Sequence, residues 1–267
     1  MQNQIVRVVA TSLSAFVFAA TILFFTLTSA FAEPTDITVR VLGKDSKFVG
    51  SSMGGARVIL RDAHTGEILA SGVTAGGTGD TKRIMHEDKG RRAQLSDDSA
   101  AKFSATIDLD APRLIEAEVY GPLAQLQSAH RAVASQWVVP GRDITGGDGW
   151  VIEVPGFVVD VLAPPAHIKL KPDTKTIDLR ANVALMCGCP IEPGGLWDAD
   201  QLDVSAIVTR DGERLAPIPM DYAGETSQFA ATLPVDAPGT YDVLVYAHDP
   251  RNGNTGLDRT TFIVPKE

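Results

Sequence analysis

The chain has 267 residues, a net charge of −9 and only two cysteines. This acidic balance disfavours nucleic acid and anionic lipid as partners, since proteins that bind either do so mainly through Lys and Arg. Two cysteines cannot staple a chain of this length, so a hydrophobic core must hold the fold. We therefore expect one large or two ordinary domains and no nucleic-acid partner.

Residues 1–32 have the pattern of a secretory signal peptide. Arg7 is the only charged residue, a long apolar run follows, and the run ends in Ala30-Phe31-Ala32, with small residues at the two positions that a signal peptidase reads. We predict cleavage after Ala32, a periplasmic or secreted location, and no membrane association afterwards. The alternative is an uncleaved N-terminal membrane anchor, because the run approaches the ~20 residues that span a bilayer.

Residues 33–163 read as a first β-domain. Apolar residues alternate over 36–42, which predicts a half-buried strand, and the runs 56–62 and 67–72 flank a Gly-containing turn, which predicts a hairpin. Further strands are expected at 102–109, 114–121, 150–154 and 157–162. The segment 124–139 is compatible with a short helix at 124–136 or a strand at 131–139. Residues 75–99 interrupt the strand pattern and predict a long surface loop.

The hairpin has a recognisable sequence. Gly55-Ala56-x-Val58-x-Leu60-x-Asp62 is followed by Thr65-Gly66-Glu67 and a second strand. This stretch resembles the small β-sandwiches of the transthyretin-like and carboxypeptidase-regulatory-like type. The resemblance implies a β-sandwich over 33–163, and it implies binding or assembly, because such modules are generally non-catalytic.

A second β-domain is predicted at 167–267, after a semi-rigid Pro-rich linker at 164–166. Seven short strands separated by turns are typical of an immunoglobulin-like sandwich. They are expected at 167–170, 176–185, 202–210, 215–220, 227–233, 239–247 and 259–264. The segment 236–247 resembles strand F of such domains, with Tyr241 at the tyrosine-corner position. The fold class is thus all-β, with two β-sandwich domains in tandem after the signal peptide.

The stretch Met186-Cys187-Gly188-Cys189-Pro190 contains both cysteines. When the inward phase of the strand at 176–185 is continued by twos, Cys187 and Cys189 fall on one face and Met186 on the other. In an immunoglobulin-like sandwich the loops at 187–200 and 248–258 lie at one end, beside the start of the domain. We therefore expect His248 to approach the cysteines near the joint between the domains.

Three interpretations of this stretch remain open. In the first, Cys187 is a small buried residue that finishes the core, and Trp197 fills the joint. In the second, Cys187 and Cys189 bind a soft metal, copper or zinc, with His248 or, where the strand bends, Met186. In the third, the two cysteines form a strained and easily reduced disulfide with a redox role.

No hydrolase motif such as HExxH or GxSxG is present in the sequence. The function that we predict is an exported, non-catalytic binding or assembly module of the cell envelope, with another envelope protein as its partner. Soft-metal binding and thiol–disulfide chemistry are the alternatives.

Overall fold

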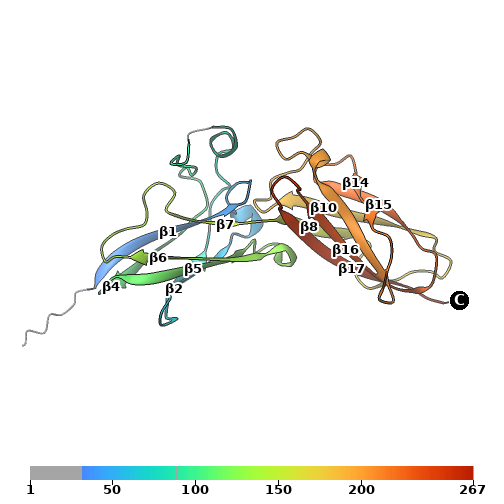
Figure 1. The fold of residues 1–267 in the computed structure, drawn as a ribbon, viewed down its shortest axis with the longest axis horizontal. Helices are drawn as coiled ribbons and strands as arrows, with labels where there is room; N and C mark the ends of the chain where they lie inside the picture. The colour runs from blue at the N-terminus through green and yellow to red at the C-terminus, as the bar shows by residue number, and fades with distance from the viewer. Residues whose placement is uncertain (1–31, 88–89, 267) are drawn as a thin grey trace, which may run out of the picture. The chain divides into compact units, whose positions relative to one another are not determined.

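The computed structural model describes residues 32–87 and 90–266. The predicted signal peptide, apart from Ala32, lies outside the described residues. Within the described ranges, no helix has the length and apolar character needed to cross a membrane. Residues from Glu33 onward form one compact unit built mainly of β-strands (Figure 1), which confirms the all-β fold class.

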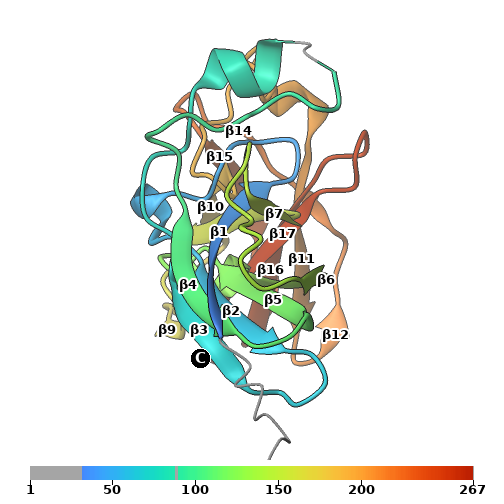
Figure 2. The same ribbon diagram turned by 90° about the vertical axis from the view of Figure 1, so that its left-hand side faces the viewer.

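The first sandwich, strands β1 to β7, consists of two sheets in the orders β4-β1-β7 and β3-β2-β5-β6 (Figure 2). The strands are β1 (Glu33–Gly43), β2 (Arg57–Asp62), β3 (Ile68–Val73), β4 (Phe103–Leu109), β5 (Arg113–Gly121), β6 (His130–Val138) and β7 (Trp150–Val154). All neighbours are antiparallel except β1 and β7, which are parallel. Alternation explains the packing: Ile37, Val39 and Val41 of β1 are all buried in the core of this sandwich.

The second sandwich, strands β8 to β17, also has two sheets. One sheet has the order β14-β15-β10-β8, with β8 (Phe157–Ala163), β10 (Thr176–Leu185), β14 (Asp221–Tyr222) and β15 (Gln228–Pro234). The other has the order β12-β11-β16-β17-β9, with β13 also paired to β11. Its strands are β9 (Ile168–Lys169), β11 (Asp203–Arg210), β12 (Glu213–Arg214), β13 (Ile218–Pro219), β16 (Gly239–His248) and β17 (Thr255–Val264).

This arrangement is the immunoglobulin-like sandwich that the sequence predicts. β10 pairs with β15 in one sheet, while β11, β16 and β17 are neighbours in the other. The tyrosine corner is present, because the hydroxyl of Tyr241 donates to the carbonyl oxygen of Ala237 at 2.8 Å. The ring of Tyr241 is fully buried and stacks on Phe262, with ring centroids 4.7 Å apart.

The predicted end of the first domain is wrong by one strand. β8 was expected to close the first sandwich, yet it pairs antiparallel with β10 and contributes Phe157 and Val159 to the second core. The predicted Pro-rich linker at 164–166 therefore does not join the two sandwiches. It lies between β8 and β9, where the chain passes from one sheet of the second sandwich to the other, since β9 pairs with β17. The sandwiches are joined instead at Pro155 and Gly156, between β7 and β8.

The structure decides the segment that the sequence left open and shows how the long loop is held. The segment 124–139 is mainly a strand, β6, preceded by one short helical turn, η3 (Leu126–Ser128). The long loop contains a short helix, η2 (Lys82–His86), and its later part is held by Asp148, whose carboxylate accepts from the backbone N–H groups of Leu95 and Ser96. Two other short helices are η1 (Ser51–Met53) and η4 (Ala199–Gln201).

Candidate binding site at the joint of the two sandwiches

The cysteines follow directly from the end of β10. Leu185, Cys187 and Cys189 all belong to the second core, and both cysteines are almost fully buried. Met186 faces the opposite way and is fully buried in the core of the first sandwich. The period-two argument is thus confirmed: one face of this segment completes the second core, and the other anchors the segment in the first.

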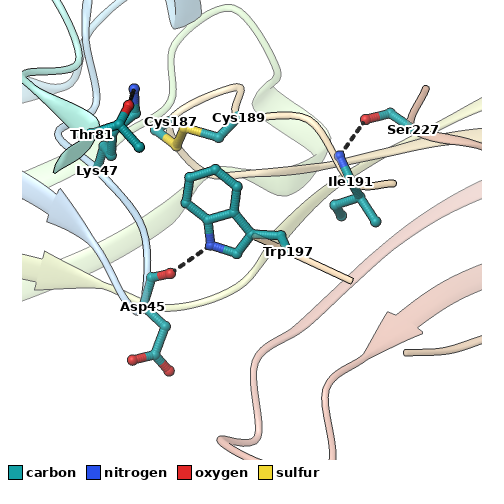
Figure 3. Close-up of a disulfide and its surroundings, with 8 residues drawn as sticks. All are labelled: Asp45, Lys47, Thr81, Cys187, Cys189, Ile191, Trp197 and Ser227. Atoms are coloured by element: carbon teal, nitrogen blue, oxygen red, sulfur yellow. Dashed lines mark hydrogen bonds between the residues drawn. A yellow bond between two sulfur atoms is a disulfide. The ribbon is translucent and has the colours of Figure 1, made fainter. Parts of the chain in front are cut away.

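Cys187 and Cys189 are joined by a disulfide, with a Cα–Cα distance of 5.3 Å (Figure 3). The chain turns back at this point, because the N–H of Gly188 donates to the carbonyl of Leu185 at 2.7 Å. Gly188 has φ of +75°, and a Cβ at this position would lie 2.6 Å from Sδ of Met53. Glycine is therefore needed for both the turn and the close approach to the first sandwich.

The loop after the disulfide is fixed at both ends. The N–H of Ile191 donates to Oγ of Ser227 at 3.1 Å, as Figure 3 shows. Farther on, Oδ1 of Asp198 accepts from the N–H groups of Gly194 and Asp200. These backbone hydrogen bonds lower the pKa of Asp198 below its ordinary value, and the bond from Gly194 has the largest effect. The fixed loop presents Leu196 and Trp197.

Trp197 connects the loop to the first sandwich. Its Nε1–H donates to the carbonyl oxygen of Asp45 at 2.8 Å (Figure 3). Lys44, the residue before Asp45, donates from Nζ to the carbonyl oxygen of Asn252. The carbonyl oxygen of Lys44 accepts from Nδ2 of Asn254. The loops 187–200 and 249–254 therefore meet beside the first sandwich, as the topology argument predicts.

The second of these loops is held by a buried carboxylate. Asp249 is 3% exposed and forms a two-pronged ion pair with Arg251, with N–O distances of 2.9 and 2.7 Å. The hydrogen bonds from Arg251 are the main cause that lowers the pKa of Asp249, so the carboxylate stays ionised in the fold. The Nδ2 group of Asn252 adds a third donor at 3.1 Å.

Two cavities border Trp197. The first has a volume of about 360 Å³ and is lined by both apolar and polar residues. Its apolar lining comes from Met85, Phe157, Leu185, Leu196, Trp197 and Leu202. Its polar lining comes from Asp45, Asp249, Arg251, Asn252 and Asn254. A mostly apolar concavity with a few polar groups, placed between two domains, is the usual form of a ligand site.

The second cavity, of about 500 Å³, lies over the disulfide. It is more polar and is shared by the Cys187–Trp197 segment, the first sandwich and the long loop. The residues that line it are Lys47, Ser52, Thr78, Thr81, His86, Cys187, Gly188, Cys189, Pro190, Glu192, Gly195, Leu196 and Trp197. Nζ of Lys47 donates to Oγ1 of Thr81 at 2.9 Å, a hydrogen bond that Figure 3 draws together with the disulfide.

The predicted metal ligands are only partly brought together. Cys187 and Cys189 are adjacent, but their sulfurs are bonded to each other. Met186 is buried in the other core, and Nδ1 of His248 lies 3.2 Å from Oγ1 of Thr255; neither residue lines the cavity over the disulfide. Within 32–87 and 90–266, no three His, Cys, Asp or Glu side chains are grouped as metal ligands. Copper or zinc binding thus stays a prediction for the reduced dithiol.

Sequence reasoning missed Lys47, Thr81 and His86. These residues lie more than a hundred positions before the cysteines, and Thr81 and His86 belong to a loop with no recognisable motif. The linear sequence contains no signal that would connect them with Cys187, because the connection depends on how the long loop folds back over the joint.

Comparisons with known proteins add little to this site. No family model matches the chain, and no curated protein matches it. Among solved structures, an engineered protein has a TM-score of 0.30 and 16% sequence identity. The match covers 47% of this chain and only 24% of the engineered protein. The fibronectin(III)-like modules of Clostridium thermocellum CbhA have a TM-score of 0.28 and 11% sequence identity, and the match covers 79% of each chain. Extracellular domains 3–5 of Drosophila OTK have a TM-score of 0.21 and 14% sequence identity, and the match covers 88% of this chain and 60% of that one. At these TM-scores the similarities carry no argument about function.

Proposed function

We propose that this chain is an exported, non-catalytic binding or assembly module of the cell envelope, and that it engages another envelope protein at the joint of its two sandwiches. The observation that carries the proposal is the first cavity, of about 360 Å³, whose lining combines apolar and polar residues. Sites that anchor a partner usually take this form, in which an apolar or aromatic side chain enters a pocket surrounded by polar groups.

The exposure of Leu196 supports the same role. This leucine is 43% exposed and lines both cavities. It is presented by a loop that is fixed through Asp198 and Trp197 rather than by a free loop. A rigid loop loses little conformational entropy on binding, which favours affinity.

The test is site-specific photo-crosslinking in the native cells. A photoreactive amino acid replaces Leu196 in one variant and Leu162, which is 45% exposed and lines neither cavity, in a matched control. We expect a discrete crosslinked species from position 196 and none from position 162. Equal crosslinking at both positions, or at neither, would contradict the proposal that the joint is the binding surface.

A further inference from the structure

We propose that the Cys187–Cys189 disulfide is a thiol–disulfide exchange site, which accepts two electrons from a thiol-bearing molecule that enters the second cavity. The proposal is independent of partner binding at the first cavity. The disulfide forms part of the wall of a cavity of about 500 Å³ instead of lying wholly inside a core.

A purely structural role explains this disulfide poorly. The two cysteines are separated by a single residue, so the bond closes a very short loop and removes little chain entropy from the unfolded state. The turn is already held by the backbone hydrogen bond from Gly188 to Leu185. The segment is also anchored by Met186 in the first core.

The surroundings select the kind of thiol. Cys187 and Cys189 are only 2% and 5% exposed, so their sulfurs are reached through the cavity and not from a flat surface. A thiol on a flexible carrier enters such a space more readily than one on a rigid protein surface. The substrate class is therefore a thiol on a flexible carrier, either a small molecule or a cysteine in an extended peptide.

Charge in the cavity favours the bond-breaking step. Lys47, held by its hydrogen bond to Thr81, lines the same cavity as Cys187, and Glu192 is the acidic residue of that lining. When a disulfide is attacked, one sulfur leaves as a thiolate, and a neighbouring ammonium stabilises that negative charge. Lys47 is thus placed as a positioning and electrostatic residue for exchange.

The reaction balances as follows. A substrate thiolate attacks one cysteine sulfur, a new S–S bond forms, and the Cys187–Cys189 bond breaks with its electron pair on the other cysteine, which takes up a proton. A second substrate thiolate attacks the substrate sulfur of this mixed disulfide, releases the first cysteine as a thiolate that is then protonated, and leaves as the oxidised substrate. The protein gains two electrons and two protons, and two substrate thiols become one disulfide.

The first experiment measures whether exchange occurs in the folded protein. The purified chain is mixed with reduced glutathione in one arm and with a reduced, unstructured peptide that carries two cysteines in the other. Thiol formation is counted by alkylation and mass spectrometry at several urea concentrations below the unfolding transition. Exchange through the cavity gives a rate that is independent of urea. A rate that rises with urea in both arms, in parallel with unfolding, overturns the proposal, because the bond would then react only after opening. The faster arm identifies the carrier of the thiol.

The second experiment tests Lys47. We expect Lys47→Gln to slow exchange about fivefold, the effect of losing roughly 1 kcal/mol of charge stabilisation at a solvated site, and Lys47→Arg to restore most of the rate. Lys169→Gln, an exposed lysine on β9, serves as the matched control and leaves the rate unchanged. An unchanged rate in Lys47→Gln overturns the assignment.

Discussion

The tyrosine corner offers the sharpest test of the second sandwich. Tyr241 has two separable contributions: its buried ring stacks on Phe262, and its hydroxyl donates to the carbonyl of Ala237 at 2.8 Å. Tyr241→Phe removes only the hydroxyl and its interactions with Ala237 and Arg210, because the ring has the same shape. Tyr241→Ala removes the ring as well and leaves a cavity in the core.

The two losses differ in size. A single intramolecular hydrogen bond contributes about 1 kcal/mol, and the unpaired Ala237 carbonyl raises the expected cost of Tyr241→Phe to about 1–2 kcal/mol. Truncation of a fully buried aromatic side chain costs about 3–5 kcal/mol, so Tyr241→Ala should be at least twice as destabilising. For a domain of about 150–250 residues, 1 kcal/mol lowers the melting temperature by about 2–4 °C.

The assay is urea unfolding followed by circular dichroism, with thermal melting as a second measure. Tyr246→Phe is the matched control, since its hydroxyl makes a 3.0 Å hydrogen bond to Asp203 at an exposed site, and we expect a change within about 0.5 kcal/mol. The reasoning is refuted if Tyr241→Phe is as stable as the native chain. It is also refuted if the Tyr241 and Tyr246 substitutions to Phe cost the same.

Three further predictions concern the joint and the first sandwich. Trp197→Phe should lower the free energy of unfolding by about 1 kcal/mol, since it deletes one hydrogen bond between the sandwiches; an unchanged urea midpoint would contradict this. Reduction of the Cys187–Cys189 disulfide should lower the free energy of unfolding by only about 1.6 kcal/mol, the loop entropy of a three-residue loop. A loss several times larger in urea unfolding would show that the disulfide is a major source of stability. Arg131 lowers the pKa of Glu118 mainly through its hydrogen bond, so the carboxylate stabilises the fold above its unfolded pKa of about 4.3 and this contribution disappears as the pH falls through the lower folded pKa. The difference in thermal stability between the native chain and Glu118→Gln should therefore shrink from about pH 5 to pH 2, and a constant difference would exclude this linkage.

Much of the fold could be predicted because strands have a simple period. The alternation of Ile37, Val39 and Val41 predicts which face of β1 is buried, and the same argument places Met186 opposite Cys187. The boundary between the sandwiches could not be predicted in this way. An apolar run such as Phe157–Ala163 fits either core equally well, and only its pairing with β10 assigns it to the second sandwich.

The candidate site was partly accessible from sequence. The immunoglobulin-like topology brings the loops 187–200 and 249–254 together, and the contacts of Trp197 and Asn254 with the first sandwich confirm this. His248, which the sequence suggests as a third ligand, does not line the disulfide cavity. It lies beside Thr255, the residue that faces it on the neighbouring strand, whereas His86 reaches the disulfide cavity from a loop that has no periodic pattern.

The sequence by itself determined the all-β class, the second core and the common face of the two cysteines, because these depend on local alternation and on residue types. The tertiary structure alone decided that Cys187 and Cys189 are bonded, that Met186 enters the other core, and that Lys47 and His86 line a cavity over the disulfide. These features depend on contacts between segments that are far apart in the chain, and such contacts are set by the packing of one sandwich against the other.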